Sequence, residues 1–263
     1  MNNNPLFFKR INLLGLGTFY YKEVKRFLSI PTQTILAPMV NSLLFLSIFH
    51  LSIGRLNSRV GELDFIIFLI PGLIMMSLIQ NSFSSTSTAI VSGKMLGAIN
   101  DMITPPLSNS EILIGFIGAG ITRGVIISIS NALAMYLFID IYVYSWAYAI
   151  FFVIFGSMLM STVGIVAGMW SEKWDHIAAI SSYAIMPMSF LSGTFYSINQ
   201  LPQQFQGIAQ LNPFFYMVDG FRYAMTGQSD GNVLISMLII STLSIIFIII
   251  TKILLDIGWK IKS

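Results

Sequence analysis

Residues 65–93 read FIIFLIPGLIMMSLIQNSFSSTSTAIVSG and contain no charged side chain. A helix of about 20 mostly apolar residues is long enough to cross the hydrocarbon core of a bilayer. The whole chain shares this bias, because 55% of its 263 residues are hydrophobic, 10% are charged and its mean hydropathy is +0.78. Soluble domains usually carry about 25% charged residues. The composition therefore excludes a water-soluble protein and predicts one that is embedded in lipid.

Charge-free runs of similar length recur along the chain, and each predicts a membrane span. We expect six transmembrane helices, at about 32–54, 65–91, 112–138, 147–170, 177–197 and 231–253. Residues 177–218 are charge-free but too long for one span, and the polar stretch 199–204 divides them. The result is one all-α membrane domain, residues 32–255, between an N-terminal segment, 1–31, and a tail, 256–263.

The basic residues predict the orientation of these spans, since short cytoplasmic loops are rich in Lys and Arg. With the N-terminus inside, the inner segments hold Lys9, Arg10, Lys22, Lys25, Arg26, Lys94, Lys173, Lys252, Lys260 and Lys262, and the outer segments hold Arg55, Arg59 and Arg222. This asymmetry predicts a multi-pass protein with both termini in the cytoplasm.

The sequence contains no motif for catalysis or for metal binding. Cysteine is absent, and His50 and His176 fall on opposite sides of the membrane in the predicted topology. Neither the phosphate-binding loop G-x-x-x-x-G-K-[ST] nor the hydrolase motif G-x-S-x-G occurs. A net charge of +3 is too small to indicate nucleic acid as a partner. We expect a protein that is not an enzyme and has no metal or cofactor of its own.

Residues 13–29 predict an amphipathic helix that lies in the membrane interface. At 100° per residue, one face holds Leu13, Leu16, Tyr20, Val24, Phe27 and Leu28, and the other holds Thr18, Lys22, Lys25, Arg26 and Ser29. Pro31 then breaks the helix before the first span. The alternative is a charged anchor that only sets the topology.

Residues 94–111, KMLGAINDMITPPLSNSE, form the longest cytoplasmic connection between spans. Residues 94–102 can form a short helix that ends before Pro105, and residues 108–110 offer N-cap side chains for the next span. The helix would present Met95, Leu96, Ile99, Met102 and Ile103, with Asp101 beside them. We expect it to dock on a cytoplasmic partner; the alternative is an ordinary polar loop.

Residues 199–230 are too apolar for a solvated loop and too interrupted for a span. Leu201-Pro202 and Asn212-Pro213 predict two helix starts, which fits two short half-helices that dip into the outer leaflet. Asp219 and Arg222 stand three residues apart on the second and could form an ion pair.

Charged side chains inside the predicted spans are scarce, and Arg123 is the one in a span interior. Gln80, Asn81 and Arg123 are candidates for lining a transport path. A structural role for Arg123, paired with polar groups, is the alternative, and the Ser and Thr residues of 82–88 are also common in packing between membrane helices.

Four stretches resemble motifs of one transporter family. Residues 211–223, LNPFFYMVDGFRY, resemble the signature L-N-P-x-x-Y-x-[VI]-x-x-x-R near the last span of ABC-2 type permeases. Residues 68–76 look like that family's second-span motif, residues 192–202 like the end of its fifth span, and residues 99–106 like its coupling loop. The similarity runs in order from about residue 15 to 258 and looks like that of the bacterial YadH, nodulation-factor and drug-resistance exporter group.

The resemblance implies a division of labour and a bacterial inner-membrane location. Two such permeases would pair as a homodimer, and two separate ABC ATPase subunits would bind ATP and Mg²⁺ in the cytoplasm. The signature residues Asn212, Pro213, Tyr216, Asp219 and Arg222 would form an outer gate, and segment 94–111 would couple the permease to the ATPase. Substrates of similar proteins include polysaccharides, lipid-linked glycans and hydrophobic drugs.

One departure concerns the coupling loop. The family commonly has an Arg and two acids there, whereas this chain has Gly97 and Asn100-Asp101.

Two other classes are kept as alternatives to the exporter. A secondary transporter would favour mid-span acids, which this chain lacks, and an intramembrane glycolipid enzyme would need convergent polar groups at one membrane face.

Overall fold

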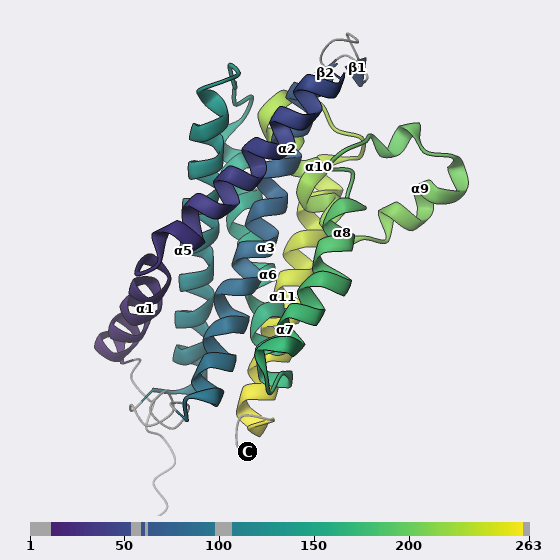
Figure 1. Ribbon diagram of the computed structural model, residues 1–263. Coiled ribbons are helices and arrows are strands. Elements are labelled where there is room, and N and C mark those ends of the chain that lie inside the picture. Colours follow the sequence, from purple (N-terminus) through teal and green to yellow (C-terminus); the bar gives the residue numbers. More distant parts are fainter. Residues whose placement is uncertain (1–11, 54–58, 61–62, 98–106, 260–263) are drawn as a thin grey trace, which may run out of the picture.

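The computed structural model describes residues 12–53, 59–60, 63–97 and 107–259, and most of them are helical. The main helices are α1 (Leu13–Leu28), α2 (Ala37–Ile53), α3 (Phe65–Met95), α5 (Asn109–Tyr136), α6 (Trp146–Trp170), α10 (Pro213–Thr226) and α11 (Val233–Ile257). The strands β1 (Arg59–Val60) and β2 (Leu63–Asp64) form an antiparallel hairpin. The long helices lie side by side, and α1 lies beside the lower part of α5 (Figure 1). The predicted all-α class is confirmed.

Five described helical segments are long and apolar enough to cross a membrane. They are Thr32–Ser52, Phe65–Met95, Asn109–Tyr136, Trp146–Trp170 and Val233–Ile257, and each overlaps one predicted span. The first of these begins with the π-helical turn η1 (Thr32–Leu36) and continues as α2. The remaining prediction, 177–197, falls on a shorter helical run, so the count of six spans stays a prediction.

That shorter run consists of α7 (Trp174–Ile180), the π-helical turn η3 (Ser181–Ile185) and α8 (Met186–Phe190). We expected helix to residue 197, but it ends at Phe190. Gly193 adopts a positive φ of 74°, which is left-handed, and the Ser192 hydroxyl donates to the Ser189 carbonyl at 2.6 Å. Charge-free composition could not reveal this turn because its stop signals are uncharged.

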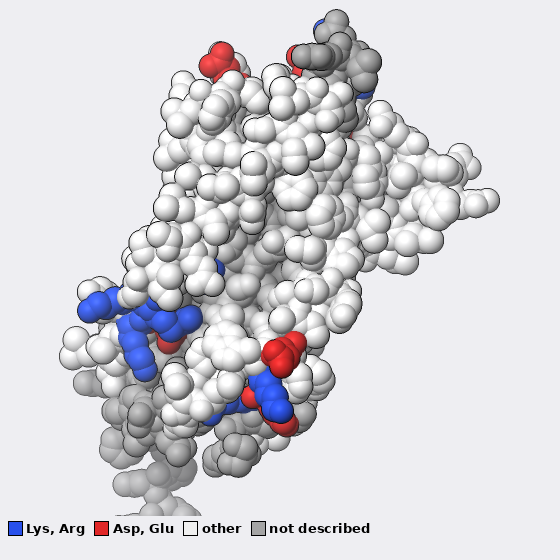
Figure 2. Space-filling view, viewed as in Figure 1, with Lys and Arg blue, Asp and Glu red and all other residues white. Residues whose placement is uncertain are grey.

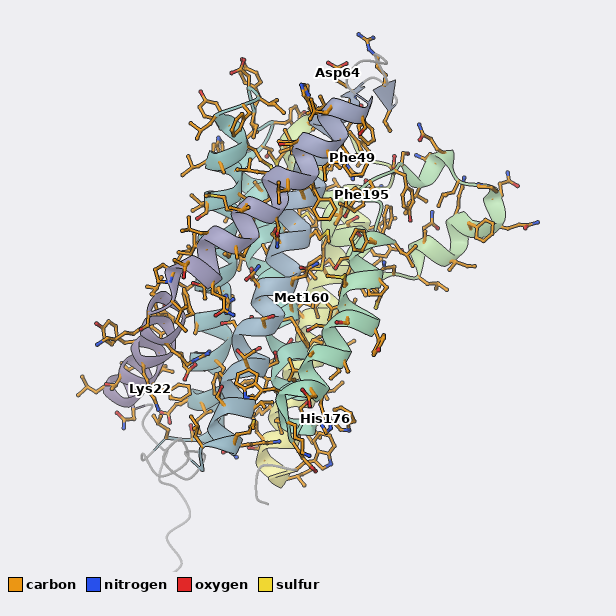
Figure 3. The ribbon with its side chains drawn as sticks, viewed as in Figure 1. Lys22, Phe49, Asp64, Met160, His176 and Phe195 are labelled. Atoms are coloured by element: carbon orange, nitrogen blue, oxygen red, sulfur yellow. The ribbon has the colours of Figure 1, made fainter. Side chains whose placement is uncertain are left out.

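Charged side chains gather at the two ends of the molecule. On the face in Figure 2, blue and red atoms lie at the top and bottom, and the band between them is almost entirely white. Lys22 and His176 lie at one end and Asp64 at the other (Figure 3). This distribution fits helices that cross a hydrocarbon layer.

Small and hydroxyl side chains bring α3, α5 and α6 into close contact. A Cβ atom added to Gly120 would lie 2.0 Å from the Ser161 hydroxyl oxygen, and one added to Gly164 would lie 2.5 Å from the Phe83 carbonyl oxygen. Thr86 donates to the Ser161 carbonyl at 2.8 Å. The polar residues after Asn81 on α3 therefore pack helices together, which was the alternative interpretation of this run.

α1 buries only part of the predicted apolar face. Phe27 of that face is buried together with Phe19 and Glu23, which were assigned to neither face, whereas Leu13 and Leu28 are exposed. Phe19 packs edge-on against Phe116 of α5, with ring centroids 4.9 Å apart. The stripe follows i, i+4 spacing toward the bundle, so the exposed apolar side chains are left for lipid.

Candidate functional site

The first group of predicted site residues lies at the start of α10. The Asn212 side chain caps this helix by accepting from the Phe214 amide at 3.0 Å, and Pro213 occupies its first turn, as predicted. The Asn212 amide also donates to the Met188 carbonyl at 2.7 Å. Tyr216 is half-buried and lies against the Phe215 ring, with centroids 5.1 Å apart. The signature thus fastens α10 to the end of α8.

Arg222 is the largest fully buried side chain of α10, at 1% exposure. Its guanidinium group donates to the Gly193 carbonyl at 2.5 Å and to the Phe68 carbonyl at 3.4 Å, and it stacks 3.8 Å from the Phe68 ring centroid. The predicted pair with Asp219 is present, with a nitrogen–oxygen distance of 3.5 Å. Arg222 therefore joins α10, the start of α3 and the turn after α8.

The acids of this region close a second set of contacts. The Asp219 carboxylate accepts the backbone amides of Asp230 and Gly231 at 2.8 and 2.9 Å. The Asp230 carboxylate accepts the Ser197 hydroxyl at 2.7 Å and the Ile198 amide at 2.9 Å. We call Phe68, Gly193, Asp219, Arg222 and Asp230 the Arg222 cluster. Arg222 forms an ion pair with Asp219, and both carboxylates accept hydrogen bonds within the chain, whereas the buried Nη1 atom of Arg222 makes no hydrogen bond.

The short helix α9 (Gln203–Gln210) stands outside this cluster and projects from the bundle (Figure 1). Phe205, Ile208 and Leu211 are exposed, and they line an apolar pocket together with residues of α8 and the following turn. The two predicted half-helices of 199–230 are thus present as α9 and α10. Of these two, α10 packs against the long helices α3, α6 and α11, whereas α9 does not.

The second group of predicted residues lies midway along α3 and α5. Gln80 and Asn81 line a groove of about 140 Å³ between α2, α3 and α8. This Gln80 groove is also lined by Pro38, Asn41, Ser42, Phe45, Leu73, Met76, Ser77, Met186 and Phe190. Arg123 does not line it, but its guanidinium donates to the Asn81 side-chain oxygen at 3.0 Å. The structure thus brings all three predicted residues together, with Arg123 behind the wall.

The third group falls mostly outside the described residues, which exclude Ile99, Asp101, Met102 and Ile103. Met95 is described and is 54% exposed. It belongs to the end of α3, not to a separate short helix, because Gly97 adopts a positive φ of 66° and ends α3. Beside it, Lys94 donates to the Met169 carbonyl and, at 3.1 Å, to the Ser171 carbonyl at the end of α6.

Comparison with known proteins identifies the family. The sequence pattern of ABC-2 type transporters matches residues 15–226. The chain belongs to the ABC-2 type transporter family. It is 31% identical over 220 residues to the Inner membrane transport permease YadH of Escherichia coli (strain K12), which covers 82% of this chain and 85% of YadH. It is 24% identical over 202 residues to Nodulation protein J of Rhizobium leguminosarum bv. viciae, which covers 76% of this chain and 78% of that protein.

Membership of the ABC-2 family confirms the predicted transport function and the predicted family. The matched region holds α1 and the helices as far as α10. Its residues include all three groups described above. The chain is therefore a multi-pass transmembrane transport subunit, and the family in general works with an ABC ATPase.

Sequence reasoning missed two charged residues of this ABC-2 chain. Glu111 caps α5 by accepting the Ser108 amide at 2.5 Å, and it accepts the Asn12 amide at the start of α1 at 2.6 Å. Ser108 and Glu111 have capping-box spacing, so this signal was present in the sequence. Glu23 is buried and pairs with Arg26 at 2.9 Å, and no local pattern distinguishes it from an exposed interface residue.

Proposed function

We propose that this chain is the membrane subunit of an ATP-driven exporter and that it forms the translocation path. The observation that carries the proposal is membership of a transporter family in a chain whose sequence has no phosphate-binding loop. The energy would then enter from a separate ABC ATPase, which would bind ATP and Mg²⁺. The chain itself would need no cofactor and would catalyse no reaction.

The assembly would contain two copies of this chain and two ATPase subunits in the bacterial inner membrane. The inner-membrane part follows the name of the YadH relative. Both termini would face the cytoplasm, which the basic residues of the inner segments support. Under this orientation a cysteine introduced at Asn57 would be labelled from outside, whereas one at Lys173 would not; the reverse pattern would contradict it.

The coupling element would be segment 94–111, with Met95, Ile99, Asp101, Met102 and Ile103 at the contact. Two described contacts support this role. Lys94 connects the start of the segment to the end of α6, and Glu111 connects its end to α1 and α5. A push on the segment would therefore reach three helices through buried or partly buried hydrogen bonds. Asp101, the one acid at the position of the family's acidic pair, would act at the rim of the contact.

The outer gate would be formed by α10 and its signature residues. These are Asn212, Pro213, Tyr216, Asp219 and Arg222. Asn212 bonds α10 to α8, and Arg222, paired with Asp219, bonds it to α3. Because these residues are bonded to one another, a cap built from them would move as a unit when the helices below it move. The transported molecule would be a polysaccharide, a glycolipid or a hydrophobic drug-like compound.

The test is ATP-dependent transport by the reconstituted permease and ATPase. We expect substrate-stimulated ATP hydrolysis by the complex and none by the permease alone. The double change Ile99→Asp with Met102→Asp would place charge in the coupling contact and should weaken co-purification of the ATPase strongly. The control is Gly17→Asp, which adds an acidic side chain at an exposed position of α1 outside the coupling segment.

Two outcomes would contradict the proposal. Transport by the permease without any ATPase would favour a secondary transporter. Turnover of a lipid substrate by the purified permease alone would favour an intramembrane enzyme. Normal ATPase association and hydrolysis in the double variant would contradict only the coupling role of the segment.

A further inference from the structure

Arg123 is a buried cation whose charge is not neutralised by any described carboxylate. It is 9% exposed, and none of the ion pairs among the described residues includes it. Its one hydrogen bond goes to the neutral amide oxygen of Asn81, and its Nε atom is buried without a partner. A buried charge in a membrane span is costly unless it is paired or serves a function.

The surroundings add positive charge to this position. Arg26 donates to the Ser85 carbonyl at 2.7 Å, one helical turn along α3 from Asn81, which accepts from Arg123. Glu23 pairs with Arg26 and so accounts for only one of the two cations. The Phe27 ring centroid lies 6.0 Å from the Arg123 guanidinium carbon, at the limit of a cation–π contact. The region where α1, α3 and α5 meet thus carries an excess of one positive charge.

The groove in front of Arg123 offers a free hydrogen-bond donor. The Nε2 atom of Gln80 is buried and has no partner in the described chain. The Asn81 amide nitrogen is already used, since it donates to the Ser77 carbonyl at 2.9 Å. A site with unused donors and excess positive charge requires a ligand that brings acceptors and negative charge.

The rim of the groove is apolar. Pro38 and Phe45 of α2 and the exposed Met186 of α8 line this part of it. The groove holds about 140 Å³, which corresponds to about four or five waters at about 30 Å³ each. It has room for a small polar group but not for a polysaccharide, so the rest of the ligand must lie outside along the apolar helices.

We propose that the Gln80 groove binds the phosphate-type oxyanion of an amphipathic molecule whose apolar part lies along α2. Gln80 donates a hydrogen bond to the oxyanion, and Arg123, behind Asn81, supplies the attracting charge. The proposal rests on the proposed exporter function and deepens it by naming the chemical class of the transported molecule. The oxyanion is the headgroup of a lipid-like ligand, and the test distinguishes it from free phosphate.

The test measures thermal unfolding of the purified full-length permease in an uncharged detergent. The probes are short-chain phosphatidic acid, the diacylglycerol with the same chains, and inorganic phosphate. We expect phosphatidic acid to raise the Tm and the diacylglycerol not to raise it. Arg123→Gln and Gln80→Leu should each weaken phosphatidic acid binding about tenfold or more, because each removes an interaction with a charged group.

Two matched controls remove the same groups from exposed positions. Lys25→Gln removes a cation from α1, one residue from Arg26, and Gln33→Leu removes an exposed amide from η1. Both should keep the wild-type affinity within about twofold. If Arg123→Gln does not fold, Arg123→Lys, which retains the charge, and Gln80→Leu still test the site: the first should keep most of the affinity and the second should lose it.

Three outcomes would overturn the proposal. Equal stabilisation by the diacylglycerol would show that only the apolar part binds. Unchanged affinity in Arg123→Gln and Gln80→Leu would remove the groove from the binding site. Stabilisation by inorganic phosphate alone, as strong as that by phosphatidic acid, would contradict an amphipathic ligand. The measurement uses neither ATP nor an ATPase, so it can fail while ATP-driven transport succeeds, and the reverse.

Discussion

Among the described residues, two arginines are buried in the helices, and their surroundings differ. Arg222 donates to two carbonyl groups, stacks on Phe68 and pairs with Asp219. Arg123 has one neutral hydrogen-bond partner and a buried Nε without any. The Nη1 atom of Arg222 also makes no hydrogen bond, but it lies 3.5 Å from the Asp219 carboxylate. Burial alone therefore does not distinguish their roles.

The contacts around a buried charge indicate whether it stabilises the fold or is available to a ligand. A charge that is satisfied within its own chain contributes to stability or to the rigidity of an element, and removing it leaves its partners unpaired. A charge that is left unsatisfied costs free energy in the resting protein, and a ligand can offset that cost when it binds. The same substitution should consequently destabilise the protein at Arg222 and leave its stability almost unchanged at Arg123.

The largest effect is expected for Arg222→Gln. This change leaves the Asp219 carboxylate, at 0% exposure, without its cation, and it removes the contacts to Gly193 and Phe68. Breaking a buried ion pair typically costs about 3–5 kcal/mol. Thermal unfolding of the purified permease should show a large loss of stability, and export should fall because less protein folds.

A double change sharpens this expectation. Asp219→Asn together with Arg222→Gln removes both charges and should be more stable than Arg222→Gln alone, since no unpaired carboxylate is left behind. If Arg222→Gln alone melts at the same temperature as the wild type, the Arg222 cluster does not hold α10 in place.

A smaller effect is expected from filling space beside Arg222. A Cβ atom at Gly220 would lie 2.0 Å from the Phe152 ring, so Gly220→Ala forces the ring or the helix to move. Overpacking of this kind costs about 1–3 kcal/mol. Gly207→Ala, on projecting α9, is the matched control, because nothing lies within 4 Å of its Cβ position. It should stabilise by about 0.5–1 kcal/mol through lower backbone entropy, and equal melting of the two variants would contradict close packing around α10.

Much of the scaffold follows from charge-free runs and helix signals in the sequence. Arg55, Arg59, Lys94 and Lys173 interrupt the apolar runs and so mark where the chain leaves the predicted spans. Asn212-Pro213 announces the start of α10 through ordinary capping chemistry. These signals depend only on neighbouring residues in the sequence, so they locate the ends of helices without knowledge of the tertiary structure.

The parts that failed depend on tertiary contacts. The end of α8 at Phe190 relies on Gly193, whose carbonyl is held by Arg222 from a distant helix. Likewise the burial of Glu23 depends on how α1 rotates against α5, and helical periodicity alone assigned Phe19 to neither face. The Ser and Thr run of α3 was ambiguous because packing and path-lining use the same residue types.

The smallest effect on stability is expected for Arg123→Gln, and it is the sharpest test of the comparison. Glutamine keeps an amide donor for Asn81 and removes a buried charge that has no carboxylate partner among the described residues. The lost hydrogen bond, worth about 1 kcal/mol, is opposed by relief of the desolvated charge. The melting temperature should therefore stay near the wild-type value while transport of the anionic substrate is lost. Destabilisation as large as that of Arg222→Gln would show instead that both arginines hold the fold together.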